Sequence, residues 1–204
     1  MEGVAEIALP GWLEQLDRID RDLTLAVNAW HNPATDAVWQ FFSHVQIWYI
    51  MYLIIIAFFF IRLGWKRALV VTISCILFVV ASDQFANLIK HSVCRLRPME
   101  DADMLARGLN ILEEHGGLYG FFSAHAANSL GFAVCSTMGF RNDNRSSYRG
   151  YALFIYVWAV LVGISRVFVG KHYLGDVLVG FAVGALIGWA LAKLGQLCIK
   201  LIYK

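Results

Sequence analysis

The sequence predicts an all-α fold, a polytopic membrane helical bundle of about five to six transmembrane helices with an N-terminal interfacial helix. Of its 204 residues, 59% are hydrophobic and only 16% are charged, and the mean hydropathy is +0.59. The hydrophobic content and the mean hydropathy are too high for an ordinary soluble domain. Five apolar segments reach or approach the length needed to cross a bilayer. The net charge of +2 is too small to indicate nucleic acid as a partner.

A chain of this length usually forms one domain, but its first part differs in pattern from the rest. We expect an amphipathic, interfacial segment over residues 1–44 and a transmembrane domain over residues 45–204. Residues 12–43 mix charged and apolar positions, as a helix lying in the membrane interface does. The first ten residues include Glu2 and Glu6 but no Lys or Arg. They lack the basic start of a cleavable signal peptide, so we expect insertion through the protein's own spans.

Five segments are the candidate spans of this domain. The first is an uncharged run just long enough to cross the hydrocarbon core, the second is interrupted only by Asp83, and the fourth is the shortest. In chain order, the candidate spans are residues 45–61, 68–88, 121–140, 151–165 and 177–192. Aromatic residues gather where the first span begins, as in the belts that mark a membrane–water interface.

Lys and Arg residues near the span ends set the expected orientation. Three clusters join the first span to the second, join the third to the fourth and follow the fifth: Arg62, Lys66, Arg67, Arg141, Arg145, Arg149, Lys193, Lys200 and Lys204. With five spans these clusters fall on one side, which the positive-inside rule makes cytoplasmic. Residues 90–122 and 165–176 then share the extracytoplasmic side. The N-terminal segment, with Arg18 and Arg21, would share that side too, against the rule.

The most informative polar residues stand at the ends of these spans. Lys90 and Arg97 follow the second span, and Pro98 prevents a helix from continuing through it. Arg offers a rigid fork of donors that matches phosphate oxygens, and Lys supplies a compact positive charge. By themselves, these two cations also fit side chains that snorkel from a helix end to the membrane surface.

Ser123 and His125 open the third span. A serine at a helix start is an ordinary N-cap, yet the free backbone N–H groups at that place also form a natural anion site. A histidine one turn into a span is costly in lipid. This cost favours a functional role for His125.

A short segment joins the fourth and fifth spans and brings in further polar groups. Ser165 and Arg166 end the fourth span, and His172 and Asp176 begin the fifth. A spacing of four places His172 and Asp176 on one helical face, where the carboxylate can hold one imidazole nitrogen. The other nitrogen is then free to act as a nucleophile or a base. The alternative is a helix-surface hydrogen bond without chemistry, and the nearby cations favour the chemical interpretation.

Together these motifs resemble those of the type 2 phosphatidic acid phosphatase (PAP2) superfamily, in its branch of membrane lipid phosphatases. That family has Lys, six residues and Arg-Pro first, then Pro-Ser-Gly-His, then Ser-Arg, five residues, His, three residues and Asp. The corresponding segments here are Lys90-HSVCRL-Arg97-Pro98, Phe122-Ser123-Ala124-His125 and Ser165-Arg166-VFVGK-His172-YLG-Asp176. The first and third match at every defined position. In the second, the serine and histidine are kept, while Phe122 and Ala124 replace the proline and glycine. Alanine crowds a backbone approach that glycine leaves open. The resemblance covers about residues 45–195.

The resemblance implies a metal-independent phosphatase with no cofactor, acting on a phosphate or diphosphate head group of a membrane lipid. It implies that His172 attacks phosphorus to form a phosphohistidine, that Asp176 orients His172, and that His125 protonates the leaving oxygen and later activates water. The residues that would hold the phosphoryl oxygens are Lys90, Arg97, Ser123 and Arg166. Fixed cations suit phosphoryl transfer, in which positioning and electrostatics dominate.

With the expected orientation, the resemblance favours undecaprenyl diphosphate or a lipid A-type phosphate, hydrolysed at the extracytoplasmic face of a bacterial inner membrane. Phosphatidic acid, phosphatidylglycerol phosphate and the oligomeric state remain open. A lipid phosphotransferase would use the same histidine but pass the phosphoryl group to an alcohol. A protein that only binds or moves anionic lipid is the non-enzymatic alternative, and the two intact histidines argue against it. A vanadate-dependent haloperoxidase uses a related pocket, but its relatives are larger and soluble.

Three further features bear on packing and on the surroundings of the site. Gly180, Gly184 and Gly188 recur on one face of the last span, a pattern that seats a neighbouring helix. Asp83 is costly in lipid and should face the bundle interior as a structural partner. An acidic loop should lie over the site and either tune the choice of head group or simply be solvated. Its members are Glu100, Asp101, Asp103, Glu113 and Glu114.

Overall fold

The computed structural model describes residues 10–114 and 116–203, so Glu2, Glu6 and Lys204 lie outside the described residues. Its elements are α1 (Gly11–Asn28), α2 (Pro33–Ser43), α3 (Val45–Leu63), α4 (Trp65–Val93), the short 3-10 helix η1 (Pro98–Glu100), α5 (Ala102–Ala106), α6 (Ala124–Phe140), α7 (Arg149–Phe168) and α8 (Leu174–Ile202). The described residues contain no strand, only an isolated antiparallel bridge between Leu96 and Tyr119. The predicted all-α class is confirmed.

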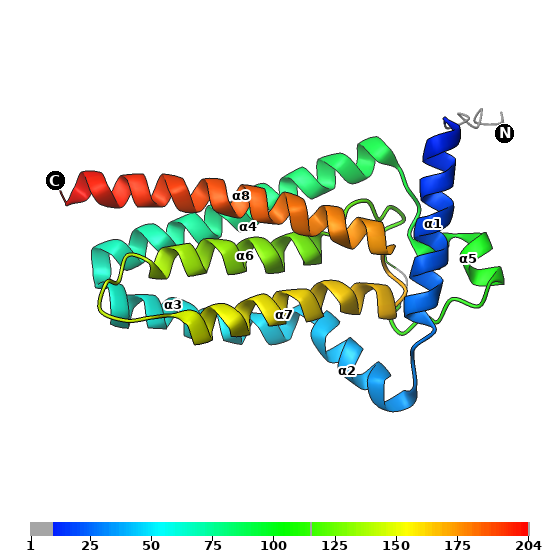
Figure 1. Cartoon of the computed structure of the whole chain (residues 1–204), viewed down its shortest axis with the longest axis horizontal. Helices are drawn as coiled ribbons and strands as arrows, with labels where there is room; N and C mark the ends of the chain where they lie inside the picture. Colours follow the sequence, from blue (N-terminus) through cyan, green and yellow to red (C-terminus); the bar gives the residue numbers. More distant parts are fainter. Residues whose placement is uncertain (1–9, 115, 204) are drawn as a thin grey trace.

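Helices α3, α4, α6, α7 and α8 run side by side as a bundle (Figure 1). α6 lies at its centre, in contact with α4, α7 and α8, while α3 packs on α4. Among the described helices, α3, α4, α7 and α8 are long and apolar enough to cross a membrane. α6, the third predicted span, has 17 residues and is mostly buried. Four helices of membrane-crossing length therefore surround a shorter central one.

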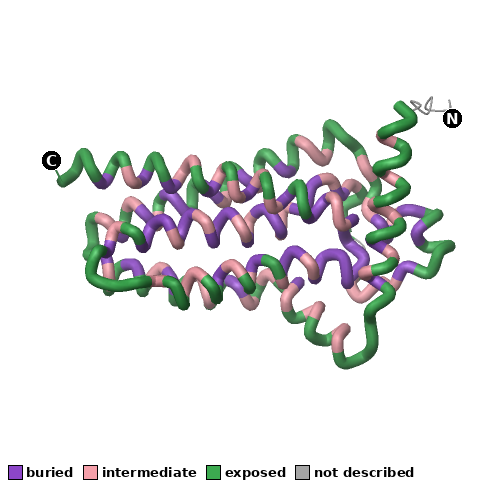
Figure 2. Tube along the Cα trace, viewed as in Figure 1, coloured by how far each residue is buried: buried purple, intermediate pink, exposed green. Residues whose placement is uncertain are grey.

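The outer faces of this bundle carry large exposed apolar side chains. Ile61 of α3 is 75% exposed, Leu153 of α7 is 69% exposed and Leu186 of α8 is 68% exposed. Figure 2 shows exposed positions recurring along the outer turns of the long helices. Apolar surface of this extent is unfavourable in water and is matched by lipid chains. The bundle is therefore that of an integral membrane protein.

The glycines of α8 form the contact with the central helix. A Cβ atom on Gly184 would lie 2.0 Å from the carbonyl oxygen of Ala127, and one on Gly188 would lie 2.4 Å from that of Gly131. A Cβ atom on Gly180 would lie 2.6 Å from the carbonyl oxygen of Ser123, at the start of α6. The backbones of α6 and α8 thus meet through positions that tolerate no side chain. The prediction that these glycines seat a neighbouring helix is confirmed.

The N-terminal segment contains two helices where the sequence predicted one interfacial helix over residues 12–43. α1 lies across one end of the bundle, and α2 leads from it toward α3 (Figure 1). The Asn32 side chain accepts hydrogen bonds from the N–H groups of Ala34 and Thr35, and Pro33 is the first residue of α2. An N-cap followed by proline starts a new helix, which the charge pattern alone does not reveal.

The basic segments gather at the other end of the bundle, where the described chain also ends (Figure 1). Arg62, in the last turn of α3, donates to Asp143 Oδ2 (3.1 Å) and Tyr148 Oη (2.9 Å) in the loop between α6 and α7. The Arg67 guanidinium lies over the ring of Tyr203, 4.5 Å from its centroid. The three basic clusters thus share one end, as the sequence predicts, and α1 lies at the opposite end.

Candidate active site

Three chain segments meet at the end of the bundle that α1 crosses. They are the loop after α4, the start of α6 and the loop that joins α7 to α8. Backbone hydrogen bonds join them: Gly120 N–H donates to Arg95 O (2.9 Å), and Ser123 N–H donates to Asp176 O (3.0 Å). These bonds bring the three sequence motifs to one place.

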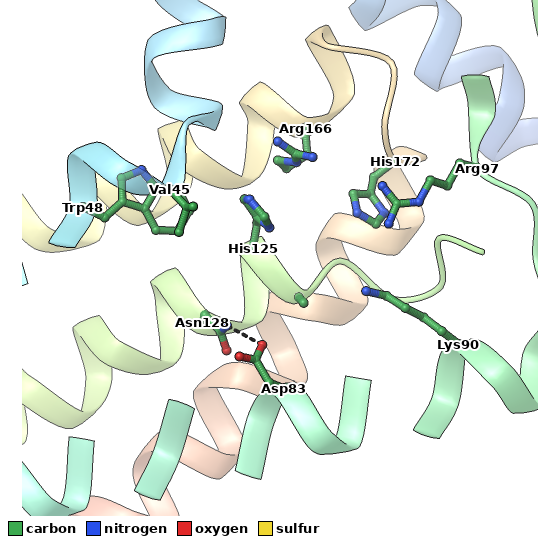
Figure 3. Close-up of a pocket in the computed structure, with 10 residues that line it drawn as sticks. Val45, Trp48, Asp83, Lys90, Arg97, His125, Asn128, Arg166 and His172 are labelled. Atoms are coloured by element: carbon green, nitrogen blue, oxygen red, sulfur yellow. Dashed lines mark hydrogen bonds between the residues drawn. The ribbon is translucent and has the colours of Figure 1, made fainter. Parts of the chain in front are cut away.

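A cavity of about 240 Å³ lies between these segments. Its lining residues are Val45, Trp48, Asp83, Lys90, Arg97, Ala124, His125, Asn128, Arg166 and His172. In Figure 3 the side chains of the two histidines and the three cations converge on this space from different parts of the chain. Five of the seven predicted site residues therefore line one cavity. Asp176 lies behind His172, and Ser123 is buried at the start of α6.

His172 and Asp176 form a buried pair. Asp176 Oδ2 lies 3.3 Å from His172 Nδ1, and Tyr173 N–H donates to the same oxygen (3.2 Å). The His172 and Asp176 side chains are 3% and 0% exposed. Burial, together with the charges of Arg166 and Arg97, lowers the pKa of His172 well below its usual value. The ring is therefore neutral near pH 7, with Nδ1 held by the carboxylate and Nε2 available as a nucleophile.

His125 stands on the first turn of α6 and faces the cavity (Figure 3). The ring of Trp48, from α3, packs against it edge to face with centroids 5.4 Å apart. On the next turn of α6, Asn128 donates to Asp83 Oδ1 (2.7 Å). Asp83 therefore has the internal partner that the sequence predicts, and the two sides of the cavity are joined below the histidine.

Three cations line the cavity from separate elements. Lys90 belongs to α4, Arg97 to the loop after it and Arg166 to the last turn of α7. Arg97 Nε donates to Tyr119 O (3.2 Å), and this hydrogen bond restricts the orientation of the Arg97 guanidinium group. Arg166 is 4% exposed, and its buried Nε has no hydrogen-bond partner among the described residues. A buried guanidinium N–H without a partner beside a cavity is a donor available to an anion.

Glu113, which the sequence placed only within an acidic loop, reaches the Arg166 guanidinium. Its carboxylate lies 3.3 Å from Arg166 Nη1 and 3.6 Å from Lys171 Nζ, and it accepts a hydrogen bond from Ser43 Oγ. Burial would raise the pKa of Glu113, but the Arg166 charge and the Ser43 hydrogen bond outweigh it and hold this pKa below its usual value. The Glu113 carboxylate is therefore charged and holds Arg166 at Nη1, leaving Nε open.

Another member of the acidic loop is also engaged. Asp101 accepts hydrogen bonds from Tyr173 Oη (2.9 Å), and its carboxylate lies 2.6 Å from Arg21 Nη1 of α1. Asp101 and Glu113 therefore tie the loop to α1 and to the site. The interpretation of this loop as simply solvated is wrong for these two residues.

The start of α6 shows how the second motif is built. Ser123 is fully buried and its hydroxyl accepts a hydrogen bond from Ala126 N–H (3.4 Å), so it is the N-cap of α6. Ala124 lines the cavity. Among the described glycines, Gly120 makes the close approach to the histidine–carboxylate pair, where a Cβ atom would lie 3.1 Å from Asp176 Oδ2. The close contact therefore occurs three residues before the N-cap.

Arg95 is a residue beside the site that the sequence interpretation missed. Its Nη1 donates to Asp176 Oδ1 (2.8 Å), on the side of the carboxylate away from His172. The available signal was a second arginine within the first motif, two positions before Arg97.

Within the described part of the chain, no group of three or more His, Cys, Asp or Glu side chains is placed to hold a metal ion.

Two curated proteins share most of their length with this chain. A lipid A 4'-phosphatase of Bacteroides thetaiotaomicron is 34% identical over 179 residues, which are 87% of this chain and 77% of that protein. A lipid A 4'-phosphatase of Porphyromonas gingivalis is 29% identical over 177 residues, covering 86% and 72% of the two chains.

Solved structures share the fold. A PAP2-type phosphatidylglycerolphosphate phosphatase from Bacillus subtilis superimposes with a TM-score of 0.69 at 22% identity, covering 89% of this chain and 87% of that one. Aquifex aeolicus LpxE superimposes with a TM-score of 0.61 at 20% identity, covering 84% and 93%. The family model of the PAP2 superfamily matches residues 72–200, the part of the chain that carries all three motifs. The chain belongs to the PAP2 superfamily and is an integral-membrane lipid phosphatase.

Proposed function

We propose that this chain removes a phosphate from a lipid A-type molecule at the extracytoplasmic face of a bacterial inner membrane, through a phosphohistidine on His172. The observation that carries the proposal is the neutral, carboxylate-held His172 facing a cavity with three cations. The two lipid A 4'-phosphatases named above support the choice of lipid. Undecaprenyl diphosphate, which the sequence favoured equally, is the competing substrate.

In the proposed reaction, His172 Nε2 attacks phosphorus and the bond between phosphorus and the lipid oxygen breaks. His125, which begins the reaction in its protonated form, gives a proton to the leaving oxygen, so the dephosphorylated lipid departs as an alcohol. His125 then accepts a proton from water, the water oxygen attacks the phosphohistidine, and the bond between phosphorus and Nε2 breaks. Inorganic phosphate leaves and His172 returns to its neutral form.

Lys90, Arg97 and Arg166 would hold the phosphoryl oxygens while negative charge shifts between them. Their fixed positions around the cavity supply positive charge without the need to reorganise during the reaction. The open Nε of Arg166 is the clearest donor for this purpose. Ser123 would act through the start of α6, because its hydroxyl caps the helix whose first N–H groups lie beside the site. In this mechanism the chain's own cations stabilise the negative charge on the phosphoryl oxygens, and no metal or cofactor takes part.

The test is phosphate release by the purified protein from a panel of lipids in the presence of excess EDTA. The panel contains a lipid A phosphate, undecaprenyl diphosphate, phosphatidic acid and phosphatidylglycerol phosphate. We expect fastest release from lipid A phosphate and no turnover by His172→Gln, which keeps the cations but removes the nucleophile. Orthovanadate, which mimics pentacoordinate phosphorus, should inhibit.

Each arm has an outcome that contradicts part of the proposal. Substantial turnover by His172→Gln would show that another group attacks phosphorus. Activity that is lost in EDTA and restored by magnesium or zinc would overturn the metal-independent mechanism. Faster release from undecaprenyl diphosphate than from lipid A phosphate would replace the substrate. Transfer of labelled phosphate to an added lipid alcohol, with little free phosphate, would identify a phosphotransferase.

A further inference from the structure

α1 supplies hydrogen-bond acceptors to the N-terminus of α8. Thr24 Oγ1 accepts from Leu174 N–H (2.9 Å), and Asp20 Oδ1 accepts from Gly175 N–H (2.7 Å). N–H groups in the first turn of a helix have no partner within that helix, so side chains from elsewhere can bind them. A Cβ atom on Gly175 would lie 2.7 Å from the Asp20 carboxylate, so the glycine permits this approach. α1 thus holds the turn of α8 that carries Asp176.

Arg95 connects the same helix to Asp176 directly. Its Nη1 donates to Asp176 Oδ1 (2.8 Å), while its Nη2 lies 2.8 Å from Asp17 Oδ1 and 2.8 Å from Asp20 Oδ2. Its guanidinium lies 3.9 Å from the centroid of the Tyr173 ring. A planar guanidinium can bridge groups on two sides in this way, whereas a Lys ammonium offers one compact charge.

The orientation of the Asp176 carboxylate depends on both of its oxygens. Oδ2 faces His172 Nδ1, and Oδ1 accepts from Arg95. Because Asp176 is 0% exposed, its charge needs a counterion and fixed hydrogen bonds to be stable there. If Arg95 were lost, the carboxylate would be free to rotate, and the ring that it holds would lose its fixed orientation.

We propose that Arg95, held by Asp17 and Asp20 of α1, is a positioning residue that fixes the Asp176 carboxylate and thereby the His172 ring. This inference rests on the proposed role of His172 as nucleophile. Arg95, Asp17 and Asp20 are absent from the lining of the site cavity. They therefore act through Asp176 and not on the lipid phosphate. α1 is, on this proposal, part of the catalytic apparatus.

The test compares substitutions at both ends of the contact with a matched control on the same helix. Arg95→Gln removes the bridge, Arg95→Lys keeps its charge, and Asp20→Asn weakens its support from α1. Asp22→Asn is the control: it is the same change on α1, but Asp22 pairs with Arg107 at the surface, where their side chains are 65% and 40% exposed. The release assay gives kcat and KM for each variant, and thermal unfolding in detergent checks that each is folded.

We expect the losses to fall on kcat while KM stays near that of the wild type. Misplacement of a catalytic group by about 1 Å costs about a hundredfold, which is the loss expected for Arg95→Gln. Asp20→Asn should lose about tenfold, since Asp17 still holds Arg95. Arg95→Lys should recover part of the activity, and Asp22→Asn should match the wild type.

A second readout does not depend on turnover. In protein labelled with ¹⁵N-histidine, the ring nitrogens of His172 can be assigned by difference from His172→Gln. We expect one tautomer, protonated at Nδ1, in the wild type and in Asp22→Asn. Arg95→Gln and Asp20→Asn should show mixed tautomers or line broadening, because the carboxylate is no longer fixed.

The proposal is overturned if Asp20→Asn and Arg95→Gln, both folded, keep the kcat and the His172 tautomer of the control, or if their losses fall on KM. Failure of the proposed function gives a different pattern. In that case the wild type releases no phosphate or His172→Gln remains active, while the His172 tautomer still reports whether Arg95 and α1 position the ring.

Discussion

At the scale of single residues, the site depends on which polar groups have a partner within the protein and which remain available to a ligand. Arg166 is held at Nη1 by Glu113, while its Nε has no partner within the described residues. Glu113 comes from a loop 53 positions away in the chain and also contacts Lys171. The Glu113 carboxylate restricts the rotamers of the Arg166 side chain, which lines the cavity and keeps one N–H without a partner among the described residues.

Glu113→Gln should lower kcat/KM about tenfold to a hundredfold. A hydrogen bond between charged groups contributes about 1.5–3 kcal/mol, and this difference in transition-state binding corresponds to that range of rates. The measurement is phosphate release at subsaturating lipid. Glu114→Gln is the matched control, since Glu114 is exposed and its backbone carbonyl, which the substitution keeps, accepts a hydrogen bond from Lys171. A rise in kcat/KM for Glu113→Gln would mean that the carboxylate competes with phosphate for Arg166.

Residues within the motifs could be predicted from the sequence because their spacing is local. His172 and Asp176 are one helical turn apart, so their contact follows from the spacing of four. The partners that hold them could not be predicted in this way. Asp17 lies 78 positions from Arg95, and pairing over that distance depends on how α1 crosses the bundle. The acidic loop showed charge without showing which carboxylate would meet Arg166.

At the scale of elements, the contact between α6 and α8 sets the distance between the two halves of the site. α6 carries His125, α8 carries Asp176, and the glycines of α8 let the two backbones touch. Periodic glycines and long apolar runs are readable from sequence: the glycine contact is confirmed, and four of the five predicted spans are helices long and apolar enough to cross a membrane. The break between α1 and α2 was missed because it depends on a capping asparagine and proline within an otherwise amphipathic stretch.

Gly184→Ala should destabilise the protein by about 1–3 kcal/mol, the usual cost of overpacking a tight core. The added methyl group would lie 2.0 Å from Ala127 O, and a backbone atom cannot move aside cheaply. The apparent Tm in detergent should fall, and turnover should fall with it as α6 and α8 separate. Gly150→Ala is the control: Gly150 lies in α7 with nothing within 4 Å of the added atom. An unchanged Tm for Gly184→Ala would show that the helices are not in contact as described.

At the scale of the whole molecule, the two ends of the bundle differ in chemistry. One end carries the basic loops, and the other carries α1, the cavity and all three motifs. This difference supports the proposed orientation, because the positive-inside rule favours the basic end on the cytoplasmic side and the site on the other. Two cations on α1 oppose that rule in sequence, but Arg21 is paired with Asp17 and Asp101, and Arg18 lies near Glu14.

Cys94 can report which side the site faces. It is exposed at the end of α4, between Lys90 and Arg97, whereas Cys75 and Cys135 are buried inside the bundle. Cys198 is exposed on α8, on the part of the helix near the basic end, so we expect lipid to cover it. In a Cys198→Ser background, a membrane-impermeant thiol reagent added to intact spheroplasts should label the protein, and Cys94→Ser should abolish labelling.

Phosphate should slow this labelling. Lys90 and Arg97 flank Cys94 in the sequence, and an anion bound to both cations restricts access of the reagent to the thiol. The rate should therefore fall as phosphate is raised, while a control salt of equal ionic strength should change it less. Labelling that appears only after the membrane is opened would place the cavity in the cytoplasm. In that case the positive-inside assignment fails for this chain, and lipids whose phosphate is exposed on the outer face are no longer its substrates.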